Sequence, residues 1–157
     1  MNATDFADRI EQEIVIHAPL ERVWELVSRP GWWVNDGDDE AAAGARDVRT
    51  ENGLDVVVDP KYGRFPVRTV AAEPPAYIAF EWASGYPGQA PVEGNSTRVE
   101  FRLSARGEGG VVLRVVESGF ASLKAPFDER KRSFEGNVEG WTQQLSLARR
   151  RAEREGA

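Results

Sequence analysis

The sequence of 157 residues contains no cysteine, only one histidine and only one methionine. Without cysteine, the chain can form no disulfide, no thiolate metal site and no cysteine nucleophile. One histidine cannot supply a metal site built from several imidazoles. A serine–histidine–acid triad would depend on that same residue, His17, which follows a predicted strand and is expected to point outward. These absences exclude most common catalytic centres, and we predict neither a metal nor a cofactor.

Positive charge and long apolar runs are also scarce. The chain has 20 Lys and Arg against 26 Asp and Glu, a formal charge of −6. An acidic chain is repelled by nucleic acids and by anionic membrane surfaces, so we expect neither as a partner. No segment approaches the about 20 apolar residues of a membrane helix, and residues 1–9 lack the apolar part of a secretion signal. The expected location is therefore cytoplasmic.

The hydrophobic pattern predicts a strand, short helices, about six further strands and a long final helix. Alternating isoleucines favour a first strand over residues 10–16, and helical spacing follows Pro19 over residues 20–27. Residues 31–33 are expected to form a second short helical turn. The pair Asn52-Gly53 predicts a hairpin. Strands are expected over residues 47–50, 54–59, 65–70, 77–82, 97–103 and 111–117.

The last segment has the spacing of one long amphipathic helix. Seven apolar residues fall on a single narrow stripe when they are placed at 100° per residue. They are Phe127, Phe134, Val138, Trp141, Leu145, Ala148 and Ala152. Gly136 and Gly140 fall outside the stripe, and each weakens the helix by about 1 kcal/mol relative to alanine.

In this order, several short motifs resemble those of the family named for the C-terminal domain of the activator of the ninety-kilodalton heat-shock protein ATPase. That family is part of the START-like (SRPBCC) superfamily. The matching stretches are residues 16–19 with Val23 and Trp24, Trp33, residues 63–65, residues 74–82, residues 117–120, and Gly140 and Trp141 with Leu145. The acidic, alanine-rich residues 35–46 depart from the family pattern.

This resemblance implies an α+β helix-grip fold. Six to seven antiparallel strands would wrap around the long C-terminal helix, with two short helices after the first strand. We expect one START-like domain over residues 1–157, with an ordered core from about residue 9 to residue 153. A cavity between the sheet and the helix would bind a small hydrophobic, aromatic or amphipathic molecule.

The five tryptophans lie on four separate segments, and aromatic side chains are expected to converge on the interior. Such rings can line a ligand cavity, or they can simply fill the core. If they line a cavity, the predicted ligand contacts are Trp33, Phe65, Trp82, Phe101, Glu117, Phe120, Phe134, Val138 and Trp141. The loop residues Tyr62 and Tyr86 could close its entrance.

Glu117 is the candidate catalytic residue and the candidate polar anchor. Strand parity places it on the same face as Leu113 and Val115, which are expected to face the helix. A carboxylate beside an apolar cavity would have a raised pKa and could bind a polar group or transfer a proton. Alternatively, Glu117 lies at the cavity mouth, solvated or paired with an arginine.

The sequence leaves three functions open. The first is ligand binding without catalysis. The second is a cyclase-like or dehydratase-like enzyme that uses Glu117 in the same cavity, as superfamily relatives imply. The third, implied by the family name, is an interaction protein with a chaperone partner. Val112 and Val116 are expected to face outward from the last strand, which suggests a homodimer contact.

Overall fold

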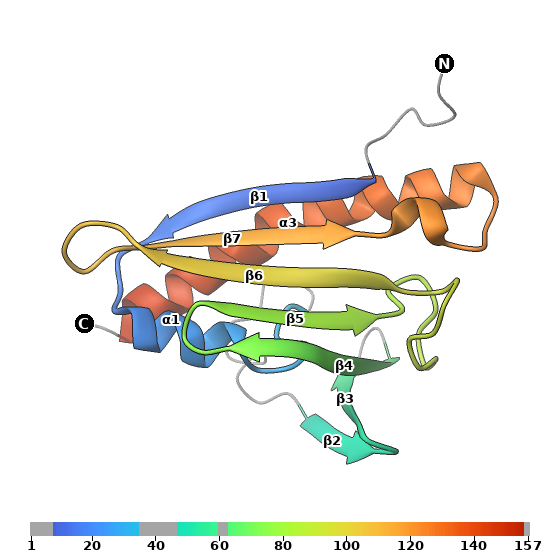
Figure 1. Cartoon of the computed structure of the whole chain (residues 1–157), viewed down its shortest axis with the longest axis horizontal. Helices are drawn as coiled ribbons and strands as arrows, with labels where there is room; N and C mark the ends of the chain where they lie inside the picture. The colour runs from blue at the N-terminus through green and yellow to red at the C-terminus, as the bar shows by residue number, and fades with distance from the viewer. Residues whose placement is uncertain (1–7, 35–46, 60–62, 156–157) are drawn as a thin grey trace.

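The computed structural model describes residues 8–34, 47–59 and 63–155, which form one antiparallel sheet and a long helix (Figure 1). The acidic, alanine-rich residues 35–46 and the tyrosine at position 62 lie outside the described residues. The strands are β1 (Arg9–Ile16), β2 (Asp47–Glu51), β3 (Leu54–Asp59), β4 (Gly63–Glu73), β5 (Tyr77–Trp82), β6 (Thr97–Ala105) and β7 (Val111–Ser118). The helical elements are α1 (Leu20–Val27), the 3-10 turn η1 (Phe120–Ser122) and α3 (Phe127–Glu155).

The seven strands are ordered β1-β7-β6-β5-β4-β3-β2, so the first strand pairs with the last. Helix α3 runs along one face of this sheet, next to β1 and β7 (Figure 1). The side chain of Gln12 in β1 fixes the helix, because its Nε2 donates a hydrogen bond to Val138 O at 2.9 Å. Thr142 Oγ1 in turn donates to Gln12 Oε1 at 3.0 Å. The chain therefore has the expected α+β helix-grip fold.

The predicted hairpin at Asn52-Gly53 is confirmed. Asn52 has φ 53° and Gly53 has φ 78°, so both residues are in the left-handed region. Two consecutive left-handed residues characterise the two-residue turn whose twist matches that of the flanking strands. The turn joins β2 to β3 with Glu51 paired to Leu54.

Residues 31–33 form turns and not the helical turn expected from the sequence. Gly31 has φ 71°, which a right-handed helix cannot contain, and Val34 N donates a hydrogen bond to Gly31 O at 2.9 Å. A Cβ atom at Gly31 would lie 2.2 Å from Val57 Cγ2. The glycine therefore lets this turn approach β3 closely, and the turn inserts Trp32 and Trp33 into the interior.

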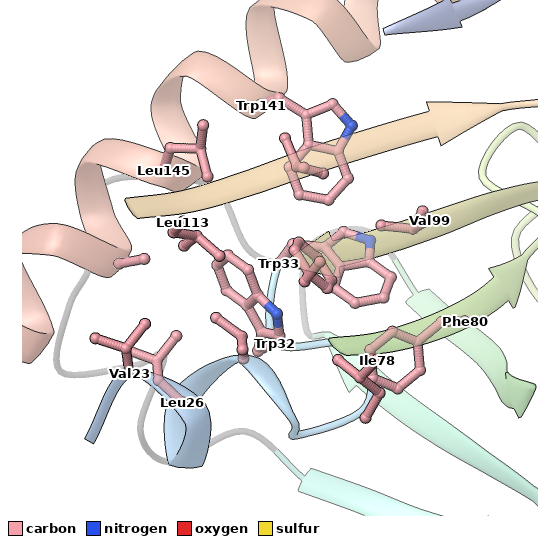
Figure 2. Packing of buried hydrophobic residues seen from close by; sticks show 14 of the residues in the cluster. Val23, Leu26, Trp32, Trp33, Ile78, Phe80, Val99, Leu113, Trp141 and Leu145 are labelled. Carbon is pink, nitrogen blue, oxygen red and sulfur yellow. The ribbon is translucent and has the colours of Figure 1, made fainter. Parts of the chain in front are cut away.

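The centre of the molecule is filled by aromatic rings from the sheet, the 31–33 turn and α3. Figure 2 shows Trp32, Trp33 and Trp141 converging between the helix and the strands. The ring centroids of Trp33 lie 5.6 Å from Phe101 and 5.8 Å from Trp141, and Trp32 lies 5.2 Å from Phe101. These distances are those of rings in mutual contact.

The apolar stripe of α3 is buried in its second half and only partly buried in its first. Trp141, Leu145, Ala148 and Ala152 are buried, whereas Phe134 and Val138 are half-buried. Leu147 and Gln144 are also buried, although neither falls on the predicted stripe. The burial thus widens toward the end of the helix, where α1 also packs against it.

The remaining surface expectations have mixed outcomes. His17 is exposed, as expected. Val112 is half-buried and Val116 is only 6% exposed, so the outer face of β7 leaves less apolar surface for a homodimer contact than expected. Neither helix in the described ranges is long and apolar enough to cross a membrane.

Candidate functional site

Glu117 is completely buried on the inner face of β7. It follows the inward residues Val111, Leu113 and Val115 at alternate positions, and its side chain is 0% exposed. The strand-parity prediction is therefore confirmed, because residues two apart point to the same face. The alternative of a solvated or arginine-paired Glu117 is wrong: no described arginine forms an ion pair with it, and its cross-strand neighbours are Ile10 and Val99.

Four donors surround the Glu117 carboxylate, two from the sheet and two from α3. Oε1 accepts hydrogen bonds from Trp141 Nε1 at 2.7 Å and Asn137 Nδ2 at 3.0 Å. Oε2 accepts from Thr97 Oγ1 at 2.5 Å and Trp82 Nε1 at 3.0 Å. A carboxylate has about four acceptor positions, so the group is saturated. The carboxylate therefore links the helix to β5 and β6.

The strand register brings the sheet donors together. Trp82 pairs with Thr97 across β5 and β6, and Val99, two residues further along β6, pairs with Glu117. Diagonal neighbours on one face of a sheet lie within reach of long side chains. The helix donors, Asn137 and Trp141, are four residues apart and so lie on one side of α3. The site is thus assembled from three adjacent strands and one helical stripe.

Burial raises the pKa of Glu117 above its ordinary value, and the four hydrogen bonds act in the opposite direction. None of the four donors carries a charge, so no cation compensates for the loss of hydration. The carboxyl group therefore retains its proton to a higher pH than an exposed glutamate would. A group of this kind can act as a hydrogen-bond anchor or as a proton acceptor and donor.

A pocket of about 400 Å³ adjoins this cluster at the end of the sheet. One wall consists of three polar residues from the segment between β5 and β6, Ser84, Tyr86 and Asn95, and of Thr97 at the start of β6. The opposite wall consists of Glu129, Arg130, Arg132 and Ser133 from the first turns of α3. Leu123 and Ala125 supply an apolar patch between η1 and α3. The lining thus combines hydroxyl, charged and apolar groups.

Backbone and side-chain hydrogen bonds fix the pocket walls. Lys124 N donates to Gly94 O at 2.7 Å, which joins the two walls, and Gly94 has φ 99°. Asn95 holds its own loop because its Oδ1 accepts from Val92 N at 2.8 Å. Arg130 Nε donates to Ala125 O at 3.1 Å, so this guanidinium secures the segment before α3. These hydrogen bonds hold both walls of the pocket in place.

Thr97 connects the pocket to Glu117. It lines the pocket, is 4% exposed, and donates the hydrogen bond of 2.5 Å to the carboxylate. A second connection is longer: Asn137 Nδ2 also donates to Ser84 Oγ, a lining residue, at 3.4 Å. The buried carboxylate therefore lies directly behind the pocket wall.

The residues predicted to contact a ligand lie beside this pocket or away from it, and none of the nine lines it. Trp33, Phe65, Trp82, Phe101 and Trp141 contact one another in the aromatic centre. Phe120 and Phe134 form a separate pair, with centroids 5.2 Å apart, and Val138 is half-buried. These contacts favour the alternative in which the rings fill the core, and a ligand contact at these positions stays a prediction.

Two residues of the site could be predicted from the sequence, and the others could not. Glu117 was found by strand parity, and Tyr86, expected near a cavity entrance, lines the pocket. Thr97 was missed because it begins a strand and carries no distinctive motif. Ser133 and Asn137 were missed as well, although they precede Trp141 at four-residue steps, which places a polar stripe beside the apolar one.

Within the described ranges, no three or more histidine, aspartate or glutamate side chains gather where they could hold a metal ion. The residues of this site can form hydrogen bonds, carry charge and, at Glu117, exchange a proton.

The family described as Activator of Hsp90 ATPase homolog 1-like protein matches residues 17–148. The chain belongs to this family. The match begins directly after β1 and ends within α3, and it includes Glu117 and all four of its donors. No curated protein is similar enough in sequence to count as a relative.

Solved structures with this fold share little sequence with the chain. A protein from Mesorhizobium loti is 20% identical, with a TM-score of 0.63 over 90% of this chain and 94% of that one. A Bacillus halodurans protein is 23% identical, with a TM-score of 0.60 over 92% and 96%. The ZhuI aromatase/cyclase from Streptomyces sp. R1128 is 21% identical, with a TM-score of 0.62 over 95% of both chains. At these identities the likeness establishes the fold alone.

Proposed function

We propose that the chain binds a small amphipathic molecule in the pocket between the β5–β6 segment and the start of α3. The observation that carries this proposal is the buried Glu117, held by four neutral donors directly behind the pocket residue Thr97. The volume of the pocket, about 400 Å³, lies within the range of small-molecule sites. Burial of a carboxylate lowers the stability of a fold. Its position beside a pocket supports a role in ligand binding, because perturbed ionisable groups cluster at functional sites.

The lining favours an amphipathic ligand over a purely hydrophobic one. Leu123 and Ala125 offer an apolar contact, while Tyr86, Arg132 and Ser133 offer polar groups on either side. The aromatic rings that could have held an apolar ligand contact one another instead. A ligand would therefore place its apolar part against the segment before α3 and its polar groups toward the sheet and helix.

The second candidate function is enzymatic, with Glu117 as the group that transfers a proton. Its raised pKa and its hydrogen bond to a pocket residue favour this reading. One protein with the same fold is named an aromatase/cyclase. Turnover lost with binding retained in a Glu117→Gln variant would distinguish catalysis from binding alone.

The test begins with native mass spectrometry of gently purified protein, followed by a thermal-shift screen of aromatic and lipid-like molecules. The same measurements are made on Ser133→Trp, which places a large ring in the pocket. The matched control is Glu135→Trp, an exposed position two residues further along α3. A ligand that binds only the folded chain raises its melting temperature.

We expect a retained molecule or a stabilising ligand in the native chain and in Glu135→Trp, and the loss of both in Ser133→Trp. Equal stabilisation in all three proteins would place the ligand elsewhere. A screen with no retained species and no stabilising molecule would contradict small-molecule binding. It would then favour the protein-interaction function that the family name suggests.

A further inference from the structure

We propose that Glu117 influences ligand selection through Thr97. The pocket binds molecules with an alcohol hydroxyl, which donates a hydrogen bond to Thr97 Oγ1. This inference rests on the proposed function, because it names the class of molecule that the same pocket accepts. Thr97 acts here as a specificity-determining residue, and Glu117 acts through it as a positioning residue.

Thr97 lies between the pocket and the Glu117 carboxylate. Among the described residues, Thr97 alone both lines the pocket and donates a hydrogen bond to Glu117. The other three donors, Trp82, Asn137 and Trp141, do not line the pocket. Any influence of the carboxylate on a bound molecule through a single intervening group must therefore pass through the Thr97 hydroxyl.

The hydrogen bond to Glu117 limits what the Thr97 hydroxyl can offer a ligand. A threonine hydroxyl has one hydrogen to donate and two lone pairs that accept. The distance of 2.5 Å to Glu117 Oε2 commits the hydrogen to the ionised carboxylate. Thr97 then offers the pocket only an acceptor, so a molecule that contacts it has to supply a hydrogen of its own.

The charge around the pocket distinguishes between two classes of ligand donor, an ammonium group and a neutral hydroxyl. The ionisable side chains on the α3 wall are Glu129, Arg130 and Arg132, so the cations outnumber the anion. The ionised Glu117 behind Thr97 balances this excess, so the site has no net negative charge to compensate a ligand ammonium group. A neutral hydroxyl donates to Thr97 without bringing an uncompensated charge into the pocket.

Protonation of Glu117 would reverse its hydrogen bond with Thr97. If Oε2 is protonated it can donate only to Thr97, because the other group on that oxygen, Trp82 Nε1, is itself only a donor. The Thr97 hydrogen then turns toward the pocket, and the preference for a ligand hydroxyl is lost. The groups that face Glu117 from β5, β6 and α3 do not titrate, and its neighbours Ile10 and Val99 are apolar.

The test compares cinnamyl alcohol with cinnamyl methyl ether, which differ by replacement of the hydroxyl hydrogen. Neither probe titrates in water, so a pH effect belongs to the protein. Dissociation constants are measured by ligand-observed NMR from about pH 5 to pH 9. The proteins are the native chain, Thr97→Val, Thr97→Ser, and Glu129→Gln as the control for the titratable carboxylate on the pocket wall.

We expect the native chain to bind the alcohol about tenfold more tightly than the ether at the upper end of this range. The ratio should fall toward one as the pH falls through the pKa of Glu117. Thr97→Val should bind both probes equally at every pH, whereas Thr97→Ser should retain the native ratio and its pH dependence. Glu129→Gln alters a lining residue that faces both neutral probes alike, so it should change both dissociation constants by the same factor and leave their ratio and its pH dependence as in the native chain. If Thr97→Val does not fold, Thr97→Ala removes the same hydroxyl and tests the same contact.

Three results would overturn the inference. If the two probes bind the native chain equally, and Ser133→Trp abolishes both, the pocket function stands and the role of Thr97 is wrong. If the ratio is unchanged in folded Thr97→Val, the hydroxyl is recognised by another residue. If neither probe binds at millimolar concentration, the proposed pocket function fails and this inference fails with it.

Discussion

The two halves of α3 cover interiors of opposite character. From Trp141 onward, the helix buries apolar side chains against aromatic rings that fill the space beneath them. Before Trp141, its side chains are half-buried or exposed, and four of those in residues 129–133 line a pocket that is largely polar. Glu117 lies where the two regions meet, and Trp141 contacts both the Glu117 carboxylate and the ring of Phe101. The aromatic rings thus mark the packed region of this chain, and the buried carboxyl group of Glu117 marks the boundary of the pocket that we propose as the ligand site.

The largest expected effect tests the filled region. Trp33→Ala removes a ring that contacts Phe101 and Trp141, and a large-to-small change in a packed core costs about 3–5 kcal/mol. Chemical denaturation would measure the loss of unfolding free energy. Trp24→Ala is the control at a partly buried tryptophan, and its loss should be smaller. Equal losses, or a nearly neutral Trp33→Ala, would mean that the rings are not tightly packed.

The next effect tests the boundary between the two regions. Glu117→Leu leaves the N–H groups of Trp82 and Trp141 without their acceptor, and we expect a loss of about 3 kcal/mol because buried unsatisfied donors are costly. Glu139→Leu, at an exposed position of α3, should be nearly neutral. A Glu117→Leu variant as stable as the native chain would show that the hydrogen bonds do not offset the burial of the charge.

The pH dependence of stability tests the electrostatics of the same residue. Burial raises the pKa of Glu117, so the folded chain holds this proton more tightly than the unfolded chain. That contribution is fully present below the unfolded pKa and is lost as the pH rises through the folded pKa. Compared with Glu117→Gln, the native chain should lose stability over this window, with a slope of at most about 1.4 kcal/mol per pH unit. Parallel curves for the two proteins would contradict the raised pKa.

The smallest effect concerns the half of α3 nearer the pocket. A Cβ atom at Gly136 or Gly140 would meet nothing within 4 Å, and neither glycine has a positive φ. Gly136→Ala and Gly140→Ala should therefore each stabilise the chain by about 0.5–1 kcal/mol, measured by denaturation. Gly31→Ala is the opposite case, since its Cβ would meet Val57, and it should destabilise the chain. A destabilised Gly136→Ala would indicate a contact that this helix makes and that the structure does not contain.

Much of the fold could be predicted from local patterns in the sequence. The strands expected at residues 77–82 and 111–117 match β5 and β7 almost residue by residue, and strand parity placed Glu117 inside. The Asn52-Gly53 pair was sufficient for the hairpin, because few residues tolerate two left-handed positions. The turn at Gly31 was not foreseen, since its cause is a close approach to Val57, far away in the sequence.

The pocket could not be predicted from such patterns. Its walls come from the β5–β6 segment, the segment after η1 and the first turns of α3, which meet only in the folded chain. Thr97 has no local signature, and its importance follows from the register that places it beside Trp82 and diagonal to Glu117. Sequence periodicity identifies which face a residue occupies, but not which loops close over it.

The most direct test of the ligand site is an NMR titration of the ¹⁵N-labelled chain with cinnamyl alcohol. A molecule bound in the pocket should produce its largest shift changes at residues 84–86, 95–97 and 129–133 and at the indole N–H of Trp82. The backbone signals of Trp33 and Leu145, within the filled core, should change least. Shifts concentrated at Trp33 and Leu145, with the pocket residues unchanged, would place the ligand in the aromatic centre and contradict the proposed site.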